Sequence, residues 1–109
     1  MIIKHQPETG KNFVSYEIDG NVISFNDEEL TIKLSKKERD ELVRLYIVED
    51  ETGGLVTSTR GGRWYVAEIV IPARRYIETA GNEEGQTNAE PVPFDIDRCE
   101  LILWEMEAS

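Results

Sequence analysis

Residues 63–71 (RWYVAEIVI) constrain the fold most, because large apolar side chains stand at both odd and even positions. A strand places alternate residues on opposite faces, so this segment is expected to be apolar on both faces. Such a strand is typical of the centre of a sheet that is covered on both sides. Residues 98–106 (RCELILWEM) have the same property. We therefore expect a buried layer that includes Trp64 and Trp104.

The length and charge of the chain exclude several classes of protein. Its 109 residues are enough for one hydrophobic core, so we expect one small domain over residues 1–109. The formal net charge of −10 disfavours binding to nucleic acid or to an anionic membrane. No apolar run has the length of a signal peptide or of a membrane span, so we expect a cytoplasmic protein.

The first half of the chain predicts a three-stranded meander. Asp19-Gly20 stands between two runs rich in β-branched and aromatic residues, which is typical of a tight hairpin. We place the two strands of this hairpin at about 13–18 and 21–25. After the polar residues NDEE, the residues LTIKL at 30–34 alternate between apolar and polar, as a strand with one buried face does.

Residues 35–48 predict one amphipathic helix. Ser35 and Glu38 have the spacing of a capping box, in which each side chain bonds the backbone amide of the other residue. Leu42 and Leu45 belong to an apolar stripe at helical spacing. The residues LYIV near the end of this segment also fit a strand, and this alternative stays open.

The second half of the chain predicts further strands. Residues 55–59 and 63–71 have the pattern of a hairpin with the three-residue loop RGG. The residues RRYIET after Pro72 predict a short strand, and residues 80–91 predict a flexible acidic surface loop. The expected fold class is α+β, with a mostly antiparallel sheet of about six to eight strands, barrel-like or sandwich-like, and the helix packed on it.

The chain offers little for catalysis. Its one histidine, His5, lies near an end of the chain that we expect to be loose. Cys99 is the one cysteine, so neither an internal disulfide nor a thiolate cluster forms, and the neighbouring acids oppose a nucleophilic thiolate. Asp95 and Asp97 share a face of an extended segment, but no calcium-loop pattern surrounds them. We expect no catalytic residues, no metal site and no cofactor.

Residues 57–76 form one basic passage, with four arginines against Glu68. These arginines either bind an anion or pair with carboxylates of the protein itself. Internal pairing is favoured, because acids outnumber bases by 22 to 12 and arginine binds carboxylates in a bidentate manner. Arginine and aromatic residues also anchor protein interfaces. The candidate interface residues are Arg60, Arg63, Trp64 and Tyr65.

The leading functional hypothesis is a non-enzymatic protein-interaction or assembly module. Its partner is another protein or a second copy of itself, since exposed sheet edges accept strands. The first alternative is an acidic mimic of nucleic acid that inhibits a basic protein. The candidate residues of that acidic surface are Glu83, Glu84, Glu90, Asp95 and Asp97. The second alternative is a small metal-dependent enzyme that uses Asp95 and Asp97.

Overall fold

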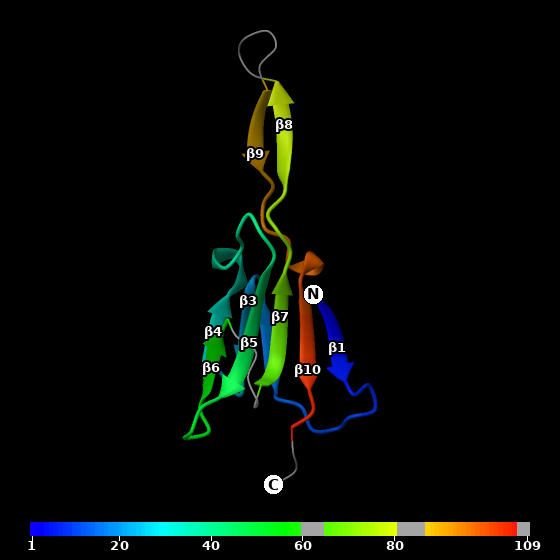
Figure 1. Ribbon diagram of the computed structural model, residues 1–109, viewed down its shortest axis with the longest axis vertical. Coiled ribbons are helices and arrows are strands. Elements are labelled where there is room, and N and C mark those ends of the chain that lie inside the picture. The colour runs from blue at the N-terminus through cyan, green and yellow to red at the C-terminus, as the bar shows by residue number, and fades with distance from the viewer. Residues whose placement is uncertain (60–64, 81–86, 107–109) are drawn as a thin grey trace.

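The computed structural model describes residues 1–59, 65–80 and 87–106, which are mostly strand and loop (Figure 1). The strands are β1 (Ile2–Gln6), β2 (Tyr16–Asp19), β3 (Val22–Phe25), β4 (Leu30–Lys33), β5 (Val43–Glu49), β6 (Leu55–Ser58), β7 (Tyr65–Ile71), β8 (Tyr76–Ala80), β9 (Thr87–Pro91) and β10 (Glu100–Trp104). The helical segments of the described chain are two short 3-10 helices, η1 (Leu34–Lys36) and η2 (Ile96–Arg98). No helix in these ranges is long and apolar enough to cross a membrane.

Five strands form a mixed sheet in the order β1-β10-β7-β5-β6. Its neighbours are antiparallel, except that β1 and β10 run parallel. β7 lies at the centre of this sheet, and all its residues from Val66 to Ile71 are buried. This confirms the predicted central position of residues 65–71, whose side chains are buried on both faces of the strand.

The strands β2, β3 and β4 form a separate antiparallel meander, which confirms the three strands predicted in the first half. The turn between β2 and β3 consists of Gly20 and Asn21, since Asp19 pairs with Val22. Gly20 has a φ of 60°, a conformation that glycine adopts at little cost.

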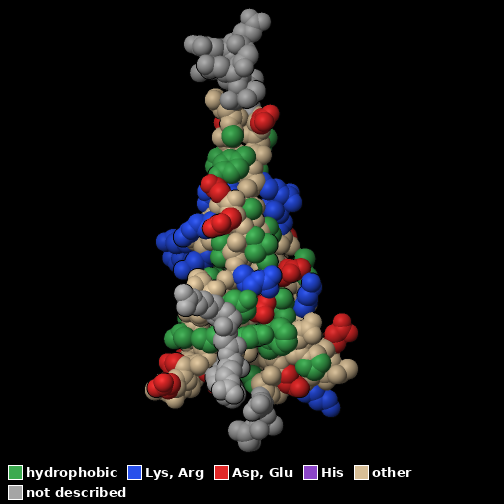
Figure 2. Space-filling model, viewed as in Figure 1, with side chains coloured by type: hydrophobic (Ala, Val, Ile, Leu, Met, Phe, Trp, Pro, Cys, Tyr) green, Lys and Arg blue, Asp and Glu red, His purple; other side chains and the backbone are tan. Residues whose placement is uncertain are grey.

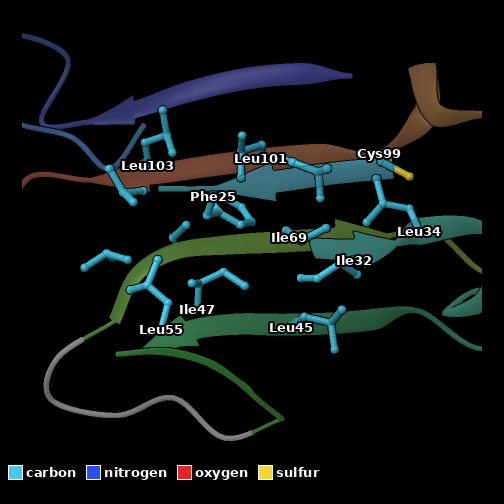
Figure 3. Close-up of a cluster of buried hydrophobic side chains, with 14 of the residues drawn as sticks. Phe25, Ile32, Leu34, Leu45, Ile47, Leu55, Ile69, Cys99, Leu101 and Leu103 are labelled. Atoms are coloured by element: carbon cyan, nitrogen blue, oxygen red, sulfur yellow. The ribbon is translucent and has the colours of Figure 1, made fainter. Parts of the chain in front are cut away.

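The meander packs on one face of the five-stranded sheet, and the facing side chains make the core (Figure 3). Phe25 and Ile32 from the meander belong to one buried cluster with Ile47, Ile69 and Leu101 from the larger sheet. Each of these five side chains is at most 4% exposed. We call the two packed sheets the sandwich.

The strands β8 and β9 form a two-stranded ribbon that projects from one end of the sandwich (Figure 1). We call this ribbon, Tyr76–Ala80 and Thr87–Pro91, the arm. Within the described chain, neither of its strands pairs with a strand of the sandwich. The short strand predicted in RRYIET corresponds to β8. The predicted loop at 80–91 includes β9, and its residues 81–86 lie outside the described ranges.

The predicted α+β fold with a helix at 35–48 is wrong. The chain forms η1, a connecting segment and β5 there, so the described fold is mostly β. The capping box does not form, because the buried Glu38 carboxylate accepts a hydrogen bond from Arg74 instead. From Val43 onward the apolar residues also recur with a period of two, and Val, Ile and Tyr favour strands. The open alternative of a strand at LYIV is the one that the structure contains.

The predicted second hairpin and the predicted loose N-terminus are also wrong. The segments 55–59 and 63–71 do not form a hairpin with each other, because β5 lies between β6 and β7 and pairs with both. The N-terminal residues, expected to be loose, form the edge strand β1 instead. His5 on β1 packs its ring against Phe13 with centroids 4.7 Å apart. Both corrections depend on pairings between segments that are distant in the sequence.

Candidate interaction surfaces

The arm leaves the sandwich at a cluster of hydrogen-bonded charged residues. Arg74 donates from Nε to the Glu38 carboxylate and from Nη1 to the Asp40 carboxylate, each over 3.3 Å. Its backbone amide donates to the Arg39 carbonyl at 2.8 Å. The hydroxyl of Tyr76, the first residue of β8, donates to Asp40 at 2.5 Å. We call Glu38, Arg39, Asp40, Arg74 and Tyr76 the arm clamp.

The ion pairs and hydrogen bonds of the arm clamp explain why the Glu38 carboxylate is stable in a buried position. Glu38 is only 7% exposed, and a buried carboxylate is costly unless a cation and hydrogen bonds accompany it. The guanidinium of Arg74 supplies both, and it also donates to the Glu38 carbonyl at 3.1 Å. The Tyr76 side chain and then the Glu38 carboxylate raise the pKa of Arg74 above its ordinary value. The clamp therefore fixes the start of the arm to the segment before β5.

The two edges of the arm differ in what they offer to another strand. Val92 donates its amide to the Arg75 carbonyl at 2.8 Å, so these two residues form a hydrogen-bonded pair below the arm. Bonded and non-bonded pairs alternate along an antiparallel ladder. The next bonded pair is therefore Ile77 with its partner on β9, whereas Tyr76 and Glu78 direct their amides to the free edge of β8.

The free edge of β9 is partly blocked by a proline. Tyr76 pairs with Pro91, Glu78 with Ala89 and Ala80 with Thr87, so Pro91, Ala89 and Thr87 direct their backbone groups outward on β9. Pro91 has no amide hydrogen, and a strand edge with a proline pairs poorly with another strand. The β8 edge keeps its backbone donors at the corresponding positions.

The side chains of the arm combine apolar and acidic groups. Ile77 is 55% exposed and Tyr76 is 46% exposed, although both belong to a paired strand. Glu78 and Glu90 are exposed as well. The sequence of residues 76–91 contains four glutamates and neither lysine nor arginine.

Basic side chains gather where the arm meets the sandwich. Figure 2 shows Lys and Arg on both sides of the molecule at this level, and none on the described part of the arm. Both η1 and η2 lie at this end of the sandwich (Figure 1). The basic residues of these helices and of the neighbouring segments are Lys36, Lys37, Arg39, Arg74, Arg75 and Arg98. These are six of the twelve basic residues of the chain, and they belong to segments next to its acidic arm.

The outer face of the five-stranded sheet carries an aromatic group. Tyr65 packs edge-on against Tyr46 and against Trp104, with ring centroids 5.5 and 5.3 Å apart. The indole Nε1 of Trp104 is buried and has no hydrogen-bond acceptor within the described ranges. Beside this group, Arg44 donates to the buried Glu68 carboxylate at 2.8 Å.

The structure places the candidate interface residues only in part. Tyr65 lies on the outer face of the sheet in the aromatic group, whereas Arg60, Arg63 and Trp64 lie outside the described residues. Of the four arginines of the basic passage, Arg74 pairs with carboxylates of its own chain.

The candidate acidic residues serve different local roles. Asp95 accepts a hydrogen bond from the Asp97 amide at 3.0 Å, and the Asp97 carboxylate pairs with the N-terminal amino group at 3.3 Å. Glu90 lies on β9 of the arm, whereas Asp95 and Asp97 lie at η2, and Glu83 and Glu84 are outside the described ranges. No three His, Cys, Asp or Glu side chains converge as a metal site would require, within the part of the chain that is described.

Cys99 is a core residue. Its side chain is 0% exposed, and burial raises the pKa of the thiol to about 11. A thiol with this pKa is protonated near neutral pH, so it is a poor nucleophile.

Comparisons with protein-family models, with curated proteins and with solved structures found no match to this chain. The sequence reasoning missed the arm as a projecting element and Glu38 as its anchor. One signal for the arm was present, because β-forming residues precede a polar stretch that contains no large aliphatic side chain and ends in Pro91. Glu38 carried no such signal, since its partner Arg74 is distant in the sequence.

Proposed function

We propose that this protein is a non-enzymatic protein-interaction module whose binding element is the arm. One observation carries the proposal: β8 and β9 pair with each other and with no strand of the sandwich in the described chain. An isolated two-stranded ribbon is only marginally stable in water. A partner strand that adds to the arm would supply the hydrogen bonds and contacts that the sandwich does not supply.

The exposed side chains of the arm support the same proposal. Ile77 and Tyr76 expose about half of their surface, and large apolar groups on a projecting element are typical of interaction sites. The arm clamp fixes the base of the arm, so less freedom is lost when a partner binds.

The test is site-specific photo-crosslinking in native lysate. A photoreactive amino acid replaces Glu78 on the arm, and in a control it replaces Glu17, an exposed residue of β2. We expect defined adducts from position 78 and none of these adducts from position 17. An excess of unlabelled protein should suppress these adducts by competition. An excess of an unlabelled variant without the arm should leave them unchanged.

The variant without the arm joins Arg75 directly to Val92 through an Asn-Gly turn, because these two residues are already a hydrogen-bonded pair. If an excess of this unlabelled variant suppressed the adducts as strongly as the unlabelled complete protein does, the proposal would be contradicted. The same adducts at both labelled positions, or no adducts from the arm, would also contradict it.

A further inference from the structure

We infer that the free edge of β8 binds an extended segment of a different protein in which cationic and apolar residues alternate. This inference rests on the proposed function and adds the chemistry of the partner. The bound segment becomes the third strand of the arm, and its backbone bonds Tyr76 and Glu78, whose amides face outward.

The backbone favours β8 over β9 as the binding edge. The outward positions of β8 are Tyr76, Glu78 and Ala80, and each has an amide hydrogen. On β9, Pro91 opposite Tyr76 has none. At the base of β8 the amide of Arg74 already donates to Arg39, so added pairing begins at Tyr76. The binding edge is therefore short and is limited to the arm.

The side chains of β8 define the pattern that the partner needs. Tyr76 and Glu78 point to one face of the arm and Ile77 points to the other. Directly opposed residues of neighbouring strands interact, so a cation belongs opposite Glu78 and an apolar residue opposite Ile77. A second cation suits the position opposite Tyr76, because cations are attracted to aromatic rings. The pattern is basic, apolar, basic.

Charge argues against a second copy as the added strand. Another arm would bring its own Glu78 and Glu90 beside the first arm, and its sequence at 76–91 has no cation to offset them. Like charges on opposed strands destabilise the pairing. A second copy has no basic residue on its own arm, and Arg74, at the base of that arm, is already bound in the arm clamp. A cationic segment of another protein has no such conflict.

The test titrates the isotope-labelled protein with the capped peptide Thr-Lys-Val-Arg-Thr and follows backbone amide shifts by NMR. We expect the Tyr76 and Glu78 amides to shift and to exchange more slowly with solvent, while the edge strands β1 and β6 of the sandwich do not respond. The affinity should fall with added salt, because it includes ion pairs at an exposed site. The acidic peptide Thr-Glu-Val-Glu-Thr should cause no such shifts.

Two proline variants provide a matched control. Glu78→Pro removes an outward amide of β8, and Ala89→Pro removes an outward amide of β9, directly across the arm. Neither change removes a hydrogen bond between β8 and β9. We expect Glu78→Pro to weaken peptide binding by about tenfold or more, as loss of a backbone bond and an ion pair implies, and Ala89→Pro to leave it nearly unchanged.

Several outcomes would overturn the inference. One is that the acidic peptide binds as tightly as the cationic peptide, and another is that both proline variants lose the same affinity for the cationic peptide. A third is that the amide signals of Tyr76 and Glu78 shift with protein concentration alone, which would assign the edge to a second copy. If arm-dependent photo-adducts form but the cationic peptide does not bind, the partner chemistry is wrong and the interaction function stands. If no arm-dependent adducts form, the function itself fails.

Discussion

At the scale of single residues, Asp50 shows how one carboxylate organises a turn between β5 and β6. Its Oδ1 atom accepts hydrogen bonds from the Thr52 amide at 2.9 Å, the Thr52 hydroxyl at 2.7 Å and the Gly54 amide at 2.9 Å. These bonds, led by the one from the Thr52 hydroxyl, lower the pKa of Asp50 below its ordinary value of 3.8. Gly53 supplies the positive φ of 83° that the turn requires.

This pKa shift predicts how stability depends on pH. A carboxyl whose pKa is lower in the folded state stabilises that state above its unfolded pKa, and the contribution is lost as pH falls through the folded pKa. We expect Asp50→Asn to lower the melting temperature at neutral pH. The difference from the original protein should disappear in acid, at pH values below the folded pKa, because Asp50 is then uncharged as well.

Thermal unfolding followed by circular dichroism over a pH series measures this effect. Glu51→Gln, a neighbouring exposed acid for which the structure shows no hydrogen bond within the described ranges, is the control. A constant difference between Asp50→Asn and the original protein at all pH values would show that the charge of Asp50 has no part in the turn.

At the scale of elements, the arm depends on a contact that crosses the sequence. Arg74 lies directly before β8, and Glu38 lies between η1 and β5, yet the two side chains meet at 3.3 Å. The same contact explains why the segment around Glu38 is extended. A helix over 35–48 would direct Glu38 towards its own first turn, whereas here the side chain is buried against the base of the arm.

Removing the guanidinium of Arg74 should destabilise the protein, because it leaves the Glu38 carboxylate buried without its cation. We expect Arg74→Ala to lower the free energy of unfolding more than Arg75→Ala does, because Glu38 then stays buried without its cation. Urea denaturation measures the change. The next residue provides the control: Arg75 is exposed, and Arg75→Ala should alter stability by about 0.5 kcal/mol or less.

If Arg74→Ala and Arg75→Ala lowered the free energy of unfolding by similar amounts, the arm clamp would have no role in stability. The pair is a sharp comparison, because both changes remove the same side chain at adjacent positions and alter the net charge equally.

At the scale of the whole molecule, the arm dominates the shape. The extents are 66 × 27 × 24 Å and the radius of gyration is 17.3 Å. A compact domain of this length would have a radius of about 13 Å. The buried core cluster includes no residue of β8 or β9 within the described chain, so the arm adds length and surface while the hydrophobic core lies elsewhere.

Replacing Tyr76–Pro91 by an Asn-Gly turn should therefore shorten the molecule and leave the sandwich folded. We expect the radius of gyration to fall to about 12–13 Å, as for a compact domain. Small-angle X-ray scattering of the monomeric fraction from a sizing column measures it, and urea denaturation checks cooperative unfolding of the sandwich. An unchanged radius, or loss of cooperative unfolding, would contradict the division into sandwich and arm.

The sequence by itself determined most strands, since alternation of apolar residues reports which faces are buried. It identified β7 as a central strand and β2, β3 and β4 as a meander, because these signals are local. It predicted a helix over 35–48, which is wrong, because the apolar residues there fit a period of 3.6 as well as a period of two. Only the residues LYIV were left open as a strand. It also favoured internal pairing of the arginines, and Arg74 shows such pairing.

Only the tertiary structure decided which strands are neighbours and which residues form the candidate site. The place of β5 between β6 and β7, the parallel pairing of β1 with β10, and the contact of Arg74 with Glu38 join segments that are far apart in the chain. The physical reason is that local propensities differ by about 1 kcal/mol or less per residue. Burial of an entire face against a distant segment outweighs such differences, and no local pattern records which segment that is.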